Sequence, residues 1–166
     1  MRIVENQPNS LVDPSVDTNS PIEILLAEDN AGDIRLTLEA FREAKLSGHV
    51  SVVRDGEEAL AFLRKQGPYA CAPRPASILL DLNMPKKDGR EVLHEVKTDP
   101  DLKTIPVMVL TTSVAPADIV RSYDLHANCY IQKPADYDDL VRLIRQLDNL
   151  WFHVIQIPST PKGAAG

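Results

Sequence analysis

The feature that most constrains the fold is an alternation of short apolar runs with longer amphipathic stretches, which begins near Pro21. The run ASILL at residues 76–80 is apolar throughout, which is typical of a strand that is buried on both faces. Comparable runs occupy residues 22–27, 49–53, 106–110 and 128–131, and apolar residues at helical spacing follow each strand. Strands that alternate with helices pair in parallel through right-handed crossovers. We therefore predict an α/β fold, a doubly wound five-stranded parallel sheet made of five βα units.

The length of the chain predicts one domain with two flanking segments. A chain of 166 residues can bury one full hydrophobic core. Residues 1–20 show no apolar period, so we expect a mobile leader before a domain at residues 21–149. The tail at 150–166 begins with the apolar sequence WFHVI, which should either fold back on the domain or pair with a second copy of the chain. Candidates for that interface are Trp151, Phe152 and Ile155.

The net charge and the lengths of the apolar runs argue against two kinds of partner. A net charge of −6 argues against a nucleic-acid-binding module, which needs a concentrated basic surface. No apolar run reaches membrane-spanning length, and the N-terminus lacks the apolar segment of a signal peptide. We therefore expect a cytoplasmic protein that binds neither nucleic acid nor a membrane.

Acidic residues follow two of the predicted strands. Glu28 and Asp29 come after the first strand, and Asp81 comes after the third. Ligands of open parallel sheets bind beyond the carboxyl ends of the strands, at the point where the strand order reverses. Crowded carboxylates raise one another's pKa unless a cation joins them, and an all-oxygen site of this kind suits Mg²⁺.

A hydroxyl and a lysine follow the last two strands. Thr111 comes after the fourth strand and can hydrogen-bond an anion, and Lys133 after the fifth supplies a compact positive charge. The sequence suggests no Ser–His or Cys–His pair, so a carboxylate is the natural nucleophile, as in aspartyl-phosphate chemistry. Taken singly, a strand-end Asp often only caps a helix and a Lys-Pro pair often only makes a turn. The joint pattern favours a site that binds a metal and a phosphoryl group together.

Over residues 22–147 the chain resembles the receiver domains of two-component signalling, whose fold is flavodoxin-like and CheY-like. The resemblance implies that Asp81 accepts a phosphoryl group from a sensor histidine kinase. The matching features are Glu28-Asp29, the segment DLNMPKKDG at residues 81–89, Thr111, Tyr130 and Lys133-Pro134.

The resemblance also implies roles for the other residues of the site. Thr111 and Lys133 would contact the phosphoryl oxygens, and Tyr130 would change rotamer together with Thr111. Pro134 would be preceded by a cis peptide bond that orients Lys133. Magnesium would be held by Glu28, Asp29, Asp81 and the backbone carbonyl of Asn83.

Two positions depart from the common pattern of the family. Glu28 stands where Asp is common, and its extra methylene would shift the metal slightly. Thr112 is larger than the usual Ala or Gly and would slow access to the phosphate. Neither departure removes the implied function.

The resemblance implies a stand-alone response regulator rather than an enzyme. Such a protein would have only slow self-catalysed phosphorylation and dephosphorylation. Its output would be the face formed by the fourth helix, the fifth strand and the fifth helix. The long loop before the third strand, the LTTS segment and the WFHVIQIP tail resemble single-domain regulators that pair with phytochrome-type histidine kinases. That subfamily would place the pigment on the kinase, and we expect a homodimer.

Three alternatives stay open at this point. A magnesium-dependent phosphatase or phosphotransferase of the haloacid dehalogenase type also forms an aspartyl phosphate, but it needs a second acid where Asn83 stands. A flavodoxin-like cofactor binder would need a phosphate loop where Glu28 and Asp29 would repel the phosphate. A receiver-like module that only binds partners would not need all five elements of the site.

Overall fold

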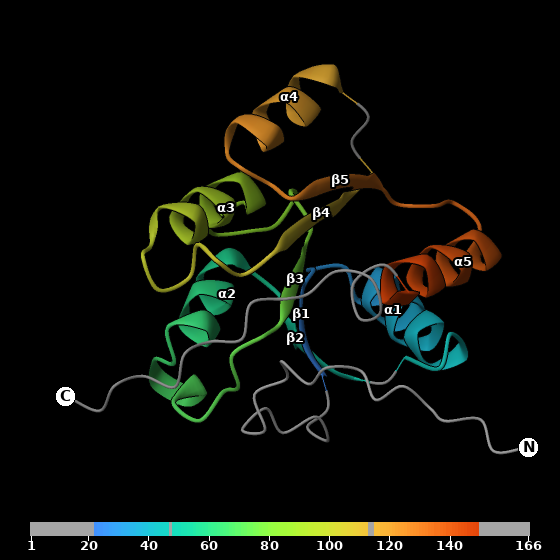
Figure 1. The fold of residues 1–166 in the computed structure, drawn as a ribbon, viewed down its shortest axis with the longest axis horizontal. Helices are drawn as coiled ribbons and strands as arrows, with labels where there is room; N and C mark the ends of the chain where they lie inside the picture. Colours follow the sequence, from blue (N-terminus) through green and yellow to red (C-terminus); the bar gives the residue numbers. More distant parts are fainter. Residues whose placement is uncertain (1–21, 47, 113–114, 150–166) are drawn as a thin grey trace, which may run out of the picture.

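The computed structural model describes residues 22–46, 48–112 and 115–149, which form one parallel sheet with helices on both faces (Figure 1). The strand order is β2-β1-β3-β4-β5, so the predicted fold class is confirmed. The strands are β1 (Ile22–Ala27), β2 (Gly48–Val53), β3 (Ser77–Leu80), β4 (Val107–Thr111) and β5 (Cys129–Gln132). The helices are α1 (Ala31–Glu43), α2 (Gly56–Leu63), α3 (Gly89–Thr98), α4 (Pro116–Asp124) and α5 (Tyr137–Asp148).

The central strands are buried on both faces, which explains why their sequences are apolar throughout. On β1, Leu25 and Ala27 join the core beneath α2 and α3, whereas Ile24 and Leu26 join the core beneath α1 and α5. In Figure 1 these two helix pairs cover opposite faces of the sheet. The same alternation continues on β3 and β4, so each central strand contributes to two cores.

Side-chain caps fix where the helices begin. The Asn30 side chain accepts a hydrogen bond from the backbone N–H of Asp33 at 2.9 Å, which satisfies one of the free donors at the start of α1. At α5, Asp136 accepts from the N–H of Asp138 at 2.7 Å. Each cap sets the direction of a helix that begins at the carboxyl edge of the sheet.

The long connection before β3 is partly ordered by a short helix that the sequence did not predict. This 3₁₀ helix, η1 (Gly67–Tyr69), places the ring of Tyr69 5.5 Å from that of Phe62 on α2. The connection therefore packs on the domain and does not approach the carboxyl ends of the strands.

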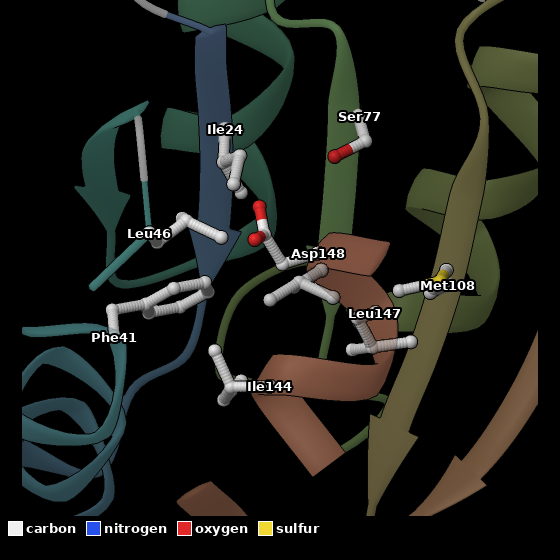
Figure 2. Close-up of a pocket in the computed structure, with 9 residues that line it drawn as sticks. Ile24, Phe41, Leu46, Ser77, Met108, Ile144, Leu147 and Asp148 are labelled. Atoms are coloured by element: carbon white, nitrogen blue, oxygen red, sulfur yellow. The ribbon is translucent and has the colours of Figure 1, made fainter. Parts of the chain in front are cut away.

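A small apolar pocket lies at the opposite edge of the sheet, between β1, β3, β4 and the helices α1 and α5 (Figure 2). Ile24, Phe41, Met108 and Ile144 form part of its wall, and the fully buried hydroxyl of Ser77 has no hydrogen-bond partner among the described residues. None of the residues predicted to do chemistry lines this pocket. Those residues follow the carboxyl ends of the strands, at the other edge of the sheet.

The predicted outer segments fall outside the described ranges. These include the leader at 1–20 and the tail with Trp151, Phe152 and Ile155, so the boundaries at 21–149 stay predictions. Within the ranges that the structure describes, no helix has the length and apolar character needed to span a bilayer.

Candidate functional site

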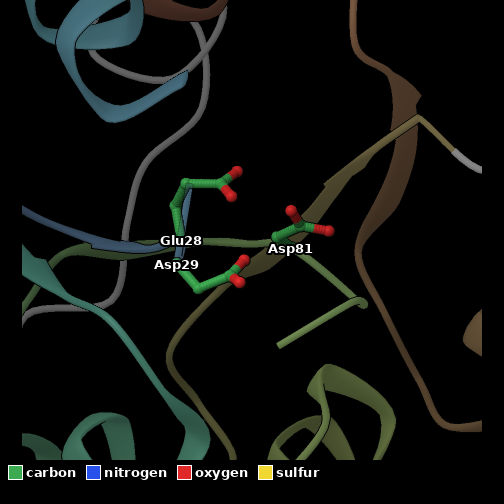
Figure 3. A group of neighbouring side chains, drawn as sticks. All are labelled: Glu28, Asp29 and Asp81. Carbon is green, nitrogen blue, oxygen red and sulfur yellow. The ribbon is translucent and has the colours of Figure 1, made fainter. Parts of the chain in front are cut away.

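Three carboxylates meet where β1 and β3 end. Ala27 pairs with Leu80 in the sheet, so the residues that follow these two strands emerge side by side. Glu28, Asp29 and Asp81 each contribute an oxygen to a group in which all three atoms lie within 4.8 Å of one another (Figure 3). The strand order reverses at β1 and β3, so the predicted acidic site lies at the switch point of the sheet.

Lys133 reaches this acidic group from the end of β5. Its ammonium donates hydrogen bonds to Glu28 and, at 3.0 Å, to Asp81 Oδ2. Its backbone N–H donates to the carbonyl oxygen of Thr111 at 2.8 Å, which fixes the main chain beside the end of β4. The geometry therefore places Lys133 opposite the carboxylates, and its contact with a phosphoryl group stays a prediction.

The electrostatics of the site follow from several carboxylates sharing one ammonium. The pKa of Glu28 is raised to about 7. Burial is the largest cause and the nearby Asp81 adds to it, while the hydrogen bond from Lys133 acts in the opposite direction. Burial alone would lower the pKa of Lys133, but its hydrogen bonds to Glu28, Asp81 and Asp33 outweigh that effect and raise it. The lysine stays charged, and the surplus of carboxylates favours a second cation.

The three acidic residues fit a divalent metal ion. Their ligand atoms are all oxygens, and an octahedral Mg²⁺ with bonds of about 2.0–2.1 Å holds its ligands at most about 4.2 Å apart. A group that already lies within 4.8 Å needs only a small contraction to reach that geometry. Glu28 and Asp81 are buried while Asp29 is exposed, so an ion could enter from the side of Asp29.

The raised pKa of Glu28 predicts that metal binding depends on pH. A proton must leave Glu28 before the carboxylate binds a metal, so the apparent affinity should fall as the pH falls below about 7. The expected loss is up to about tenfold for each pH unit. Electron paramagnetic resonance of bound Mn²⁺ at about pH 6 and about pH 8 measures this difference. Glu28→Gln is the control, because its weaker binding should change little with pH. Equal affinity of the unchanged protein at both values would contradict the prediction.

The loop after Asp81 is clamped by close backbone contacts. A Cβ added to Gly89 would lie 2.3 Å from the backbone oxygen of Asp81, and one added to Gly56 would lie 2.0 Å from that of Lys87. Asp88 caps α3 with a capping box, and the loop residue Lys86 forms an ion pair with Asp55 at 3.1 Å. Asp81 itself accepts a hydrogen bond from the N–H of Asn83 at 3.0 Å. These contacts fix the direction of the Asp81 carboxylate.

The remaining predicted residues occupy the same edge of the sheet. Thr111 is fully buried at the end of β4, and Tyr130 is partly buried against the core beneath α2 and α3. Thr112 is exposed. The predicted roles of Thr111 and Tyr130 in switching, and of the Asn83 carbonyl in metal binding, stay predictions.

The expected cis peptide bond before Pro134 is wrong for this structure. The described residues contain no cis peptide bond, so the bond between Lys133 and Pro134 is trans. The trans form is favoured by about 0.5–1 kcal/mol even before proline. From this backbone the Lys133 side chain already reaches the carboxylates.

One residue of the site was missed in the sequence. Asp33, in the first turn of α1, accepts a hydrogen bond from Lys133 Nζ at 3.0 Å. The available signal was its position in the first turn of the helix that begins directly after Asp29 and Asn30. Because the same helix position is also common for carboxylates that favour the helix dipole, the sequence did not distinguish the two roles.

Comparison with known proteins agrees with the fold and the acidic site. The family model for the response regulator receiver domain matches residues 24–145, which is most of the chain. The chain belongs to the receiver domains of response regulators, and the resemblance found in the sequence is confirmed.

Within this family, the chain is similar to two cyanobacterial response regulators over most of its length. It is 46% identical to response regulator Rcp1 of Synechocystis sp. (strain ATCC 27184 / PCC 6803 / Kazusa), over 87% of this chain and 99% of Rcp1. A crystal structure of Rcp1 in its Mn²⁺-bound form is similar with a TM-score of 0.78 and 47% identity, covering 84% of this chain and 100% of the other. The crystal structure of the phosphorylated cyanobacterial phytochrome response regulator RcpA is similar with a TM-score of 0.80 and 51% identity, with the same coverage.

Proposed function

We propose that Asp81 accepts a phosphoryl group from the phosphohistidine of a sensor histidine kinase, with Mg²⁺ bound beside it. The observation that supports this most strongly is the hydrogen bond of 3.0 Å between Asp81 Oδ2 and the ammonium of Lys133. Asp81 Oδ1 is meanwhile held by the N–H of Asn83. A carboxylate held in this way can present an oxygen to phosphorus while a permanent cation stands next to it.

The transfer needs one bond to form and one to break. An oxygen of Asp81 attacks phosphorus, and the bond from phosphorus to the kinase imidazole breaks. The imidazole nitrogen keeps the electron pair and later takes a proton from water. When bound, Mg²⁺ would offset the negative charge of the phosphoryl oxygens, and Glu28, Asp29, Asp81 and the Asn83 carbonyl would hold it.

Phosphorylation then acts as a charge switch. It adds roughly two negative charges to a site that is already acidic. In our proposal the Thr111 hydroxyl and the Lys133 ammonium bind the new oxygens, and Tyr130 changes rotamer with Thr111. The surface formed by α4, β5 and α5 is remodelled as a result, and a partner recognises it.

We further propose a phytochrome-type histidine kinase as the partner, in keeping with the RcpA relative, which is described as a phytochrome response regulator. The long connection before β3, the LTTS segment and the tail sequence resemble the same subfamily. The pigment would belong to the kinase. The chain would act in the cytoplasm, with only slow phosphorylation and dephosphorylation of its own.

Phosphotransfer from a panel of purified histidine kinases tests the proposal. A phytochrome-type kinase that carries labelled phosphohistidine should transfer its label to this chain faster than kinases of other input classes. The label should be acid-stable, base-labile and located on the peptide that contains Asp81. Rapid turnover of small phosphate esters without any kinase would instead support the phosphatase alternative. Equal transfer from all kinases would contradict the phytochrome assignment alone.

The homodimer is a separate proposal, because its predicted interface residues lie outside the described ranges. Its support is the apolar sequence WFHVI that begins two residues after Asn149 in the chain. Light scattering of the full chain at tens of micromolar tests it. A dimer that dissociates when Trp151 and Phe152 are both replaced by Ser would support the tail interface, and a monomeric full chain would contradict it.

A further inference from the structure

The ammonium of Lys133 has a third carboxylate partner that does not belong to the metal-binding group. Asp33 Oδ2 lies 3.0 Å from Lys133 Nζ, the same distance as Asp81 Oδ2. Its side chain is 40% exposed, whereas those of Glu28 and Asp81 are 3% and 9% exposed. Asp33 therefore holds the lysine from the solvent side of the site.

We propose that Asp33 is a positioning residue that keeps the Lys133 ammonium at the site when a divalent cation takes over Glu28 and Asp81. This inference rests on the proposed function, since it assigns the partner of the lysine during phosphoryl transfer. A metal ion and an ammonium that share two carboxylates repel each other, so metal binding weakens the hold of Glu28 and Asp81 on the lysine. Asp33 lies outside the group that can hold the metal, and its bond to the lysine survives that exchange.

The local structure leaves the Asp33 carboxylate free of a capping role. The side chain of Asn30 caps α1 by accepting the backbone N–H of Asp33, so that bond does not depend on the Asp33 side chain. The carboxylate instead lies in the first turn of α1, where the helix dipole favours negative charge. Replacing Asp33 by Asn therefore removes the charge that holds Lys133 and keeps the helix start.

Loss of the Asp33 charge should have two measurable effects. First, the lysine depends more on Glu28 and Asp81 and competes harder for them, so metal affinity falls. Second, the ammonium is less well placed once metal is bound, so phosphorylation slows even at saturating metal. A half-exposed charged hydrogen bond predicts a change of about threefold to tenfold in each quantity.

The experiment compares the unchanged chain with Asp33→Asn, Asp33→Glu and the control Glu39→Gln. Glu39 is an exposed carboxylate on the same helix, where it pairs with Arg35. Binding of Mn²⁺ is measured by electron paramagnetic resonance, and the rate of labelling by acetyl phosphate is measured against Mg²⁺ concentration. We expect Asp33→Asn to weaken Mn²⁺ binding and to lower the saturating rate, Asp33→Glu to recover most of both, and Glu39→Gln to change neither. A saturating rate and a Mn²⁺ affinity equal to those of the unchanged chain would overturn the proposal.

A second background shows whether Asp33 acts through the lysine. In a Lys133→Ala chain, Asp33→Asn should cause no further fall in the saturating rate, because the group that it positions is gone. A further fall of the same size would overturn the positioning role. If the unchanged chain takes no label on Asp81, the proposed function fails. The Mn²⁺ affinity can still be compared between Asp33→Asn and the unchanged chain, once with Lys133 present and once in the Lys133→Ala background. A loss of affinity that appears only when Lys133 is present shows that Asp33 acts on the metal site through the lysine.

Discussion

Replacing Asp81 by Asn should abolish labelling of the chain by acetyl phosphate or by a phosphorylated kinase. The amide that replaces the carboxylate is not a nucleophile toward phosphorus. Glu28 has comparable contacts, from the N–H of Asn30 and from Lys133, but the resemblance to receiver domains makes Asp81 the acceptor. Asp81 is held by the N–H of Asn83 on one oxygen and by Lys133 on the other. Intact mass spectrometry after incubation with acetyl phosphate and Mg²⁺ measures the result directly.

The fold should survive this change, because it removes one charge from a crowded acidic group. Lys133 keeps its hydrogen bonds to Glu28 and Asp33, and the thermal midpoint of Asp81→Asn should be no lower than that of the unchanged chain. Asp101→Asn is the matched control, since that exposed residue lies between α3 and β4, at the other edge of the sheet. Persistent label in Asp81→Asn would show that a different residue accepts the phosphoryl group.

Replacing Gly89 by Ala should strongly destabilise the fold at the site. The new methyl would lie 2.3 Å from the backbone oxygen of Asp81 and 2.6 Å from Cα of Leu82, and neither atom is the end of a flexible side chain. The backbone at the end of β3 must move, at an expected cost of about 3 kcal/mol in the free energy of unfolding. The same movement turns the Asp81 carboxylate away from Lys133, so labelling should slow as well.

Urea unfolding measures the stability effect, with Gly32→Ala as the matched control. An added Cβ at Gly32 approaches only the side-chain oxygen of Asn30, at 3.2 Å, and alanine is the better helix residue. The control should unfold at the same midpoint as the unchanged chain or at a higher one. An unchanged midpoint for Gly89→Ala would mean that the end of β3 is not as tightly enclosed as the contacts indicate.

The order of the elements could be read from the sequence because each strand has its own apolar run. The bounds of β1 agree with the prediction, but β3, β4 and β5 each begin one residue later than predicted. The ends of a strand depend on its pairing partners. Ala76, for example, donates a backbone hydrogen bond to Glu23 yet lies before the start of β3. Those partners are distant in the sequence, so the residues of the strand alone do not fix its first residue.

The acidic site was predictable to the extent that topology determines it. Glu28, Asp29 and Asp81 had to converge, since they follow adjacent parallel strands. The contact between Asp33 and Lys133 joins residues that are 100 positions apart, and it depends on the direction in which α1 leaves the sheet. The isomer of the bond before Pro134 was inferred from family resemblance, and nothing local in the sequence decides it.

The connection between Lys133 and α5 is short, so a movement of the lysine should be transmitted to the start of that helix. Only Pro134 and Ala135 separate the lysine from Asp136, the residue that caps α5. The first residue of that helix, Tyr137, donates a hydrogen bond from its hydroxyl to Glu43 on α1 at 2.8 Å. When the ammonium exchanges one oxygen for another, only two residues separate its movement from the start of α5, where that helix meets α1. We therefore expect this exposed hydrogen bond of Tyr137 to change when the charge at the site changes.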